Sequence, residues 1–149
     1  MRIALGSDHA GFDLKERIRQ HLETRAIEVK DFGTTGRESV DYPDFAFAVA
    51  EAVASGEYDY GMMVCSTGIG MSIAANKVKG IRAALVYNVD VAAQSRAHLD
   101  SNILVLGQKY MTPEEAIAAV ASWLATPFEG GRHERRLQKI VAYEAKAAR

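Results

Sequence analysis

One stretch of this 149-residue chain decides its fold: Met62-Met63-Val64-Cys65-Ser66-Thr67-Gly68-Ile69-Gly70-Met71-Ser72-Ile73-Ala74-Ala75-Asn76. An apolar run ends at Cys65, a loop of small residues follows, and apolar residues return at Met71, Ala74 and Ala75 with near-helical spacing. This pattern predicts a strand, a tight turn and a helix. The small residues allow the backbone to turn sharply, so that free N–H groups at the start of the helix converge into a seat for negative charge.

Cys65 is the only cysteine of the chain, and its place at the end of the predicted strand makes it face this seat. Positive potential from the exposed amides favours the thiolate over the thiol, which makes the side chain a candidate base or nucleophile. The alternative is a buried cysteine beside an ordinary strand-to-helix turn, because free cysteine is among the most buried residue types. The other residues of the chain must decide between the two.

The composition excludes several classes of protein. The chain has 18 basic and 19 acidic residues and a net charge of −1, so it has no general attraction to nucleic acid or to an anionic membrane. No apolar run approaches the ~20 residues that a membrane-spanning helix needs. One cysteine cannot form an internal disulfide, and the N-terminal residues follow a strand pattern rather than that of a signal peptide. We therefore expect a cytoplasmic protein.

Strand-like and helix-like segments alternate along the chain, whose length suits a single domain spanning residues 1–149. We expect strands at 2–6, 27–32, 60–65, 81–86 and 102–107, and helices at 12–22, 42–53, 71–77, 89–98 and 112–124. In the first of these helices, Lys15 is assigned to the polar face. Five such alternations predict an α/β fold, a doubly wound, Rossmann-like three-layer sandwich with a five-stranded, mainly parallel sheet.

Ligands of such sheets lie beyond the carboxyl ends of the strands. Asp8, His9, Cys65 and Gly107 all follow predicted strands, so we expect them to share one rim of the sheet. Residues 33–43 form a loop that is longer than usual for an α/β unit and rich in residues that break helices and strands. Loops of this kind are often functional.

The C-terminal segment, residues 127–149, departs from the alternating pattern. Gly130-Gly131 breaks the preceding helix, and another helix begins near Arg132. Arg132 and Arg136 lie four residues apart, hence on one helical face near its N-terminus, where two guanidinium groups suit a phosphate. The alternative is a solvated basic helix end. Leu137, Ile140 and Val141 lie on one side of this helix, after the Gly-Gly hinge, which makes the helix able to dock on another subunit.

These groups together fit proton abstraction beside a carbonyl in a small phosphorylated molecule. Aldose–ketose isomerisation needs a base, hydrogen-bond donors for the enediolate oxygen and a cationic anchor for the phosphate. His98, at the end of a predicted helix, could transfer the proton that opens a cyclic sugar, and His9 beside Asp8 could pair with a sugar hydroxyl. Each of these histidines, taken alone, is more often structural.

The chain resembles the type B ribose-5-phosphate isomerases, a family that also includes galactose-6-phosphate isomerase subunits and allose-6-phosphate isomerase. The resemblance covers essentially the whole chain and rests on five motifs: Ser7-Asp8-His9-Ala10-Gly11-Phe12, Asp41-Tyr42-Pro43, Cys65-Ser66-Thr67-Gly68-Ile69-Gly70, Ala74-Ala75-Asn76-Lys77, and Gly130-Gly131-Arg132-His133 with Arg136.

The resemblance implies interconversion of ribose 5-phosphate and ribulose 5-phosphate, with roles for particular residues. Cys65 moves the proton between C1 and C2, and His98 opens the furanose ring, aided by Asp8 and His9. The enediolate is held by Thr67 and by the backbone amides of Ser66, Thr67, Gly68, Ile69 and Gly70. Asp41 and Tyr42 border the sugar. Arg132 and Arg136 grip the phosphate.

The resemblance further implies that the site forms between two subunits of a homodimer or of a dimer of dimers. The C-terminal helix crosses to the partner subunit. The family uses no metal or organic cofactor, and the sequence contains no paired cysteines or His-Glu-x-x-His helix. The implied partner is therefore a small phosphorylated sugar.

The chain departs from the family pattern at three positions that border the implied site. Leu99 stands where asparagine is general, Ser66 where glycine is usual and Lys109 where arginine is usual. Leucine cannot supply amide hydrogen bonds, and lysine replaces a bidentate phosphate contact by a point charge. The substrate could therefore be allose 6-phosphate, galactose 6-phosphate or erythrulose 4-phosphate instead.

Two other functions remain as alternatives. A non-catalytic sugar-phosphate-binding module would need neither the Cys65 base nor the His98 ring opener, which argues against it. A thiol-redox enzyme would need a resolving cysteine, which the sequence lacks.

Overall fold

The computed structural model describes residues 1–147 and has a single five-stranded sheet. The strand order is β2-β1-β3-β5-β4, and every neighbouring pair is parallel. The strands are β1 (Arg2–Ser7), β2 (Glu28–Asp31), β3 (Tyr60–Cys65), β4 (Ala83–Leu85) and β5 (Ile103–Gly107). The predicted α/β sandwich is therefore confirmed, and the sheet is parallel throughout.

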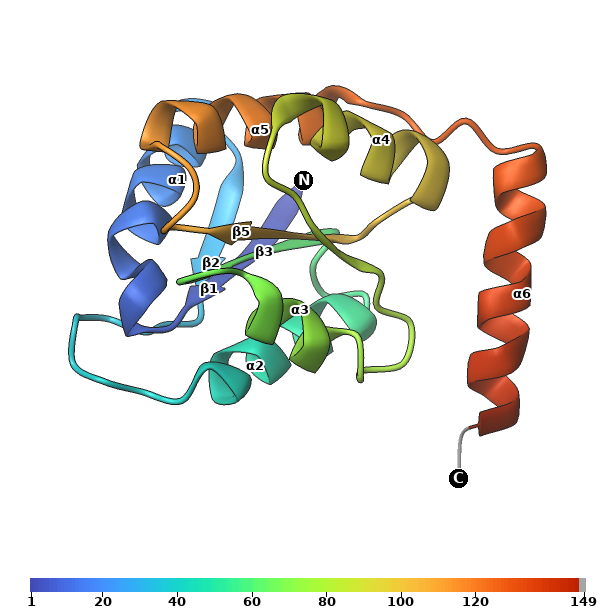
Figure 1. Ribbon diagram of the computed structural model, residues 1–149, viewed down its shortest axis with the longest axis horizontal. Coiled ribbons are helices and arrows are strands. Elements are labelled where there is room, and N and C mark those ends of the chain that lie inside the picture. Colours follow the sequence, from blue (N-terminus) through green and yellow to red (C-terminus); the bar gives the residue numbers. More distant parts are fainter. Residues whose placement is uncertain (148–149) are drawn as a thin grey trace.

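Helices cover both faces of this sheet (Figure 1). They are the short 3-10 helix η1 (His9–Gly11), α1 (Phe12–Thr24), α2 (Tyr42–Ala54), α3 (Ile69–Ala75), α4 (Val89–Leu99), α5 (Pro113–Ala125) and α6 (Arg132–Ala147). The apolar sides of α1, α4 and α5 pack in one hydrophobic core, and those of α2 and α3 pack in a second core on the other face. Helix α6 stands apart at one end of the molecule (Figure 1).

The central strands β1, β3 and β5 are almost entirely buried, as expected for parallel strands covered on both faces. Met62 and Val64 of β3 face the core beneath α1 and α5, whereas Met63 and Cys65 face the core beneath α2 and α3. Because side chains alternate between the two faces of the sheet along β3, the Cys65 side chain lies on the same face as α3. Helix α3 directly follows the turn after Cys65.

Several element boundaries differ from the prediction by one or two residues, those of α3 and β4 among them. Helix α3 begins at Ile69 instead of residue 71, and β4 covers Ala83–Leu85 instead of 81–86. On β4, which is an edge strand, the backbone N–H and C=O of Ala83 are both bonded to the side-chain amide of Asn76. A side chain thus replaces a neighbouring strand at this edge, which is a tertiary contact that the apolar pattern does not reveal.

The start of α5 follows the predicted capping pattern. The Thr112 side chain accepts from the Glu115 N–H, the Glu115 carboxylate accepts from the Thr112 N–H, and Pro113 opens the helix. None of the helices in residues 1–147 is long and apolar enough to cross a membrane.

Candidate active site

The Cys65 side chain lies at the centre of the turn between β3 and α3. Its Sγ accepts a hydrogen bond of 3.1 Å from the backbone N–H of Gly68, and the side chain is only 5% exposed. Gly68 has a φ of +83°, and a Cβ there would lie 2.4 Å from Leu85 Cδ1. The close approach and the left-handed backbone therefore both require glycine. The turn thus directs an amide at the sulfur, a contact that stabilises negative charge on it.

The end of β5 fixes the other side of this turn. The N–H groups of Gln108 and Lys109 donate to the carbonyls of Cys65 and Ser66, both at 2.9 Å. A Cβ on Gly107 would lie 2.4 Å from the Thr67 carbonyl oxygen, so only glycine lets the two segments pack so closely. These two carbonyls are therefore already bonded, while within the turn the N–H groups of Gly68 and Ile69 donate to Cys65 Sγ and Thr67 Oγ1.

The loop after β1 lies against the same strand end. The Asp8 N–H donates to the Val64 carbonyl at 3.3 Å, and the Asp8 carboxylate caps η1 by accepting from the Gly11 N–H at 3.0 Å. His9 Nδ1 accepts from the Val40 N–H at 3.1 Å. In the neutral ring the proton must then be on Nε2, which can donate to a ligand oxygen.

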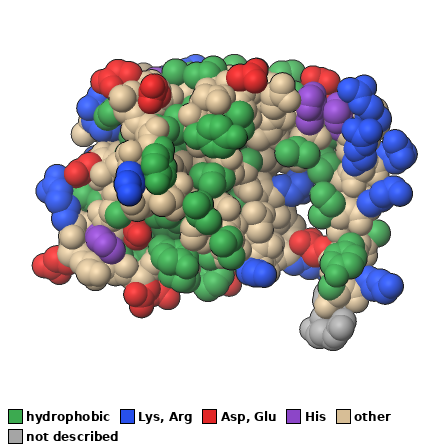
Figure 2. All heavy atoms as spheres, in the orientation of Figure 1, with side chains coloured by type: hydrophobic (Ala, Val, Ile, Leu, Met, Phe, Trp, Pro, Cys, Tyr) green, Lys and Arg blue, Asp and Glu red, His purple; other side chains and the backbone are tan. Residues whose placement is uncertain are grey.

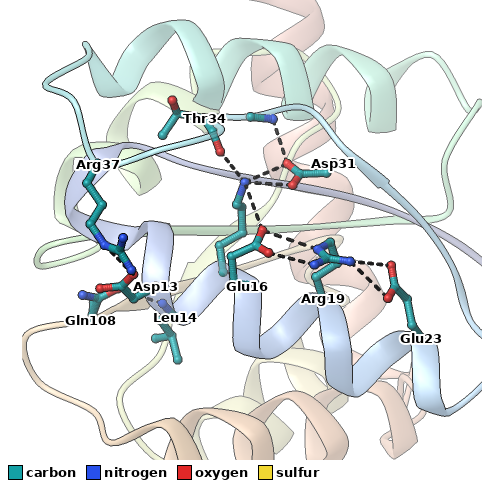
Figure 3. A network of polar contacts seen from close by, with 11 residues as sticks. Asp13, Leu14, Glu16, Arg19, Glu23, Asp31, Thr34, Arg37 and Gln108 are labelled. Carbon is teal, nitrogen blue, oxygen red and sulfur yellow. Dashed lines mark hydrogen bonds and ion pairs between the residues drawn. The ribbon is translucent and has the colours of Figure 1, made fainter.

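Lys15 fastens the long loop after β2 to the body of the protein through Asp31 and Thr34, which are labelled in Figure 3. Its buried Nζ lies 2.9 Å from both carboxylate oxygens of Asp31 and also donates to the Thr34 carbonyl. The assignment of Lys15 to a solvated face was wrong, because its side chain is fully buried. Lys15 at one end of the loop and His9 at the other thus fix the segment that leads to Asp41.

Tyr42 and Lys109 complete the border of the Cys65 turn. A Cβ on Gly70 would lie 2.8 Å from the Tyr42 ring, so this ring rests on the first turn of α3. Asp41 precedes α2 without capping it through its side chain. A cavity of about 420 Å³ adjoins the turn beside Thr67 and Gly107, and Tyr87 and Tyr110 form part of its wall.

The structure brings one group of predicted site residues together at the carboxyl edge of the sheet, which we call the Cys65 cluster. Its members come from the end of β3, from four loops and from the first residues of η1, α2 and α3. They are Asp8, His9, Asp41, Tyr42, Cys65, Ser66, Thr67, Gly68, Ile69, Gly70 and Lys109. The expectation of a shared rim is confirmed by the register, in which Ser7 pairs with Val64 and Cys65 with Gly107.

A second group, which we call the His98 cluster, comprises His98, Leu99, Glu129, Arg132, His133 and Arg136. The rings of His98 and His133 are stacked with centroids 4.2 Å apart and planes within 9°. One oxygen of Glu129 lies 3.8 Å from the Nε2 atoms of both histidines. The two arginines are exposed on the first turns of α6. Histidine and basic side chains gather there in Figure 2, at the upper end of α6.

The two clusters lie at opposite edges of the sheet. Helix α4 starts after the carboxyl end of β4 and runs back to the amino end of β5, so His98 lies at the edge where the strands begin. The Asn102 carbonyl, just after this helix, accepts from the N–H of Gly61 near the start of β3. Cys65 ends the same strand, and the four residue steps from Gly61 to Cys65 span roughly 13 Å. One chain therefore does not bring Cys65 and His98 together.

Glu129 and His133 are the residues of the His98 cluster for which the sequence reasoning gave no role. Burial and the repulsion of nearby positive charge on His98, Arg132 and Arg136 lower the pKa of His133, while the charge of Glu129 opposes this effect. The i,i+4 spacing of Glu129 and His133 was the available signal, but only the fold places them against His98.

Within residues 1–147, His98, Glu129 and His133 form the group whose ligand atoms are close enough to hold a metal ion. These atoms all lie within 4.8 Å of one another. A metal bound by two imidazoles must lie near the plane of both rings, about 2 Å from each nitrogen. Stacked, parallel rings direct their lone pairs along parallel planes that do not meet at one point. The observed arrangement therefore does not suit a shared metal.

Comparison with known proteins gives one consistent answer. Residues 3–140 match a family model described as Ribose/Galactose Isomerase. Ribose-5-phosphate isomerase B of Escherichia coli is 48% identical over 143 residues, covering 96% of each chain. The structure of ribose-5-phosphate isomerase B from Clostridium thermocellum has a TM-score of 0.98 and 53% identity, covering 99% of this chain and 100% of that one.

A solved structure with a ligand is also similar. Ribose-5-phosphate isomerase B from Mycoplasma genitalium, with bound ribulose-5-phosphate, has a TM-score of 0.94 and 44% identity and covers 98% of this chain and 97% of its own. Family model, sequence relatives and structures thus agree over nearly the full length. The chain belongs to the Ribose/Galactose Isomerase family and is an aldose–ketose isomerase.

Proposed function

We propose that the enzyme interconverts ribose 5-phosphate and ribulose 5-phosphate, with Cys65 as the base. The observation that carries this proposal is the hydrogen bond from the Gly68 amide to Cys65 Sγ, in a turn whose carbonyls are engaged elsewhere. A thiolate held in this way can accept a proton from carbon, and the nearby donors can stabilise an oxyanion. Support for the substrate comes from the names of the relatives and from ribulose-5-phosphate in the Mycoplasma genitalium structure.

The proposed reaction begins with the opening of the furanose ring. His98 donates a proton to the ring oxygen as the bond from that oxygen to C1 breaks, and the C1 hydroxyl gives up its proton to the Asp8 carboxylate. Exchange with solvent then takes the proton from Asp8 and restores the one that His98 gave, before the next turnover. Cys65 then takes the proton from C2, which leaves a cis-enediolate held by Thr67 and by the amides of residues 66–70. The sulfur returns the proton to C1 while the proton of the C2 hydroxyl moves to the C1 oxygen. No atom is gained or lost, and no cofactor is needed.

The complete site is proposed to form between two chains. A second copy would bring the His98 cluster to the Cys65 cluster, with Arg132 and Arg136 gripping the phosphate. Helix α6 is the element proposed to reach the partner. Its support is the exposure of Ile140, Val141 and Tyr143, large apolar side chains along a helix that stands away from its own core.

The preferred sugar depends on residues at the border of the two clusters. Leu99 is half exposed beside His98, so an apolar side chain faces the place where a polar contact is usual. This observation keeps allose 6-phosphate, galactose 6-phosphate and erythrulose 4-phosphate as the second candidate substrates.

A substrate panel tests the proposal. Initial rates on ribose, allose, galactose and erythrulose phosphates should be highest for ribose 5-phosphate, with deuterium from solvent entering C1 of the ketose product. If ribose 5-phosphate were the poorest of the panel, the substrate assignment would be wrong. If no deuterium entered C1 even in slow turnover at low substrate concentration, where the Cys65 proton has time to exchange with solvent, the base mechanism would be overturned.

The variant Cys65→Ala separates catalysis from binding. Loss of a general base typically costs about 10²- to 10⁴-fold in rate. The variant should therefore lose turnover while its affinity for the substrate, measured by calorimetry, stays within about threefold. Unchanged turnover would remove Cys65 as the base, and would favour another catalytic group.

A further inference from the structure

The stack of His98 and His133 is an unusual arrangement for two basic side chains. Their ring centroids are 4.2 Å apart with nearly parallel planes, and both Nε2 atoms lie 3.8 Å from the same oxygen of Glu129. His133 is buried, and its Nε2 has no hydrogen-bond partner. A buried polar atom without a partner is costly, so the arrangement invites a functional explanation.

Backbone bonds hold the three residues in place. The Glu129 N–H donates to the Ala97 carbonyl at 3.0 Å, which ties the segment before α6 to the residue next to His98. The His133 N–H donates to the Gly130 carbonyl at 3.1 Å, closing the first turn of α6. The carboxylate and the buried ring are therefore fixed relative to the end of α4.

This arrangement restricts the His98 ring in two ways. Stacking on the buried His133 ring limits rotation of the His98 side chain, which is itself about one-third exposed. A carboxylate at one edge of an imidazole favours a proton on the nitrogen that faces it, and so leaves the other nitrogen for a ligand.

We propose that Glu129 and His133 are positioning residues for His98, which hold its ring in one orientation and direct its Nε2 to the carboxylate, so that Nδ1 faces the sugar. This inference rests on the proposed function, in which His98 opens the ring. It assigns Glu129 to the ring-opening step alone and gives it no part in the proton transfer at Cys65.

The charges that face the histidine pair are Glu129, before α6, and Arg132 and Arg136, on α6 itself. Both arginines disfavour a proton on His133, and Glu129 favours it. Removal of the Glu129 charge therefore makes protonation of His133 harder, which should alter the acid side of the pH profile for the ring-opening reaction.

The experiment compares two substrates that share the same phosphate but differ in whether a ring must open. Ribose 5-phosphate is mostly a furanose, whereas ribulose 5-phosphate is an open chain because its 5-hydroxyl is esterified. In the variant Glu129→Gln, we expect turnover of ribose 5-phosphate to fall by about tenfold or more, a typical effect of losing a partner that orients a functional histidine. Exchange of the C1 proton of ribulose 5-phosphate with D₂O should stay within twofold of the wild type.

Two further variants complete the test. Glu129→Asp keeps the charge at shorter reach and should recover part of the lost turnover. Glu134→Gln, the matched control, removes an exposed carboxylate of α6 that accepts from Gln138, and should leave both rates unchanged. The acid limb of the ribose 5-phosphate profile should shift in Glu129→Gln and not in the control.

The outcomes are distinguishable. Equal losses of turnover and exchange in Glu129→Gln would mean that Glu129 supports phosphate binding or the fold, and would overturn the inference. Unchanged rates of both turnover and exchange would also overturn it. A wild-type enzyme that carried out neither reaction would instead overturn the proposed function, together with the inference that rests on it.

Discussion

At the residue scale, the chemistry of the Cys65 turn depends on glycines that allow close approach. Gly68 donates to the sulfur from a left-handed conformation, and Gly107 lets β5 pack against the turn. The sequence shows small residues in both places, and the structure gives their reason: backbone or side-chain atoms occupy the space where a Cβ would be.

Gly68→Ala tests this reason. The added Cβ would lie 2.4 Å from Leu85 Cδ1, and the alanine would have to adopt a φ of +83°. We therefore expect a loss of stability of about 1–3 kcal/mol and a fall in kcat. Gly80→Ala is the matched control, because Gly80 has a φ of +87° but nothing lies within 4 Å of its Cβ position. Urea denaturation and steady-state rates measure both effects. Equal losses of stability and kcat in the two variants would show that backbone strain alone, without the clash, explains them.

His133 predicts a pH dependence of stability. Its pKa in the folded protein is lowered, mainly by burial, from the ordinary value near 6.5, so the unfolded chain binds its proton more readily. The free energy of unfolding should therefore be independent of this group above that value and should decrease as pH falls below it. Thermal unfolding between pH 7.5 and 5.5 measures the decrease. The variant His133→Asn should show a smaller decrease in stability over this pH range. An identical decrease in the variant and the wild type would show that other groups cause it.

At the scale of elements, the Cys65 cluster depends on how loops are fastened to helices and strands. The segment 33–41 has no regular structure, but Lys15 of α1 bonds its beginning and His9 bonds its end. A buried cation paired with Asp31 thus positions the loop that carries Asp41 to the rim.

Replacement of Lys15 by methionine should destabilise the protein by about 3–5 kcal/mol, because Asp31 would lose its buried partner. The KM for substrate should also rise as the loop loses its anchor. Lys30→Met is the matched control: Lys30 is exposed on β2, and we expect a change within about 0.5 kcal/mol. Urea denaturation and steady-state kinetics check both. A Lys15→Met protein of normal stability would contradict the role of the ion pair.

At the scale of the whole molecule, the separation of the Cys65 and His98 clusters is the main consequence of the topology. A parallel sheet with returning helices places the ends of its strands and the ends of its helices at opposite edges. Catalysis that needs both clusters therefore needs two chains in the proposed mechanism.

Complementation tests the shared site. Chains with Cys65→Ala and chains with His98→Ala should each be nearly inactive alone. If each site takes Cys65 from one chain and His98 from the other, random mixing of the two in a dimer should restore about a quarter of wild-type activity, because half of the dimers are mixed and each has one intact site. The activity of the unfractionated mixture measures this, and mixed dimers isolated through two different affinity tags should have about half of the wild-type activity. A mixed fraction as inactive as its parents would place both residues in one site of one chain.

The sequence by itself determined the order of strands and helices, the capping of α5 and the residues that gather at the carboxyl rim. These features depend on local periodicity, turn chemistry and the rule that parallel strands end at one edge. It did not predict that Lys15 is buried, because a lysine enters a core only with a partner that the fold supplies, here Asp31 from β2.

Only the tertiary structure decided how far apart the predicted site residues lie and which side chains surround His98. Residues 98, 129 and 133 belong to different segments. The stack of rings beside one carboxylate exists because α4, the segment between α5 and α6, and α6 itself meet. Sequence patterns record which residues share a face of one element. Contacts between elements depend on packing, which the chain settles only when it folds.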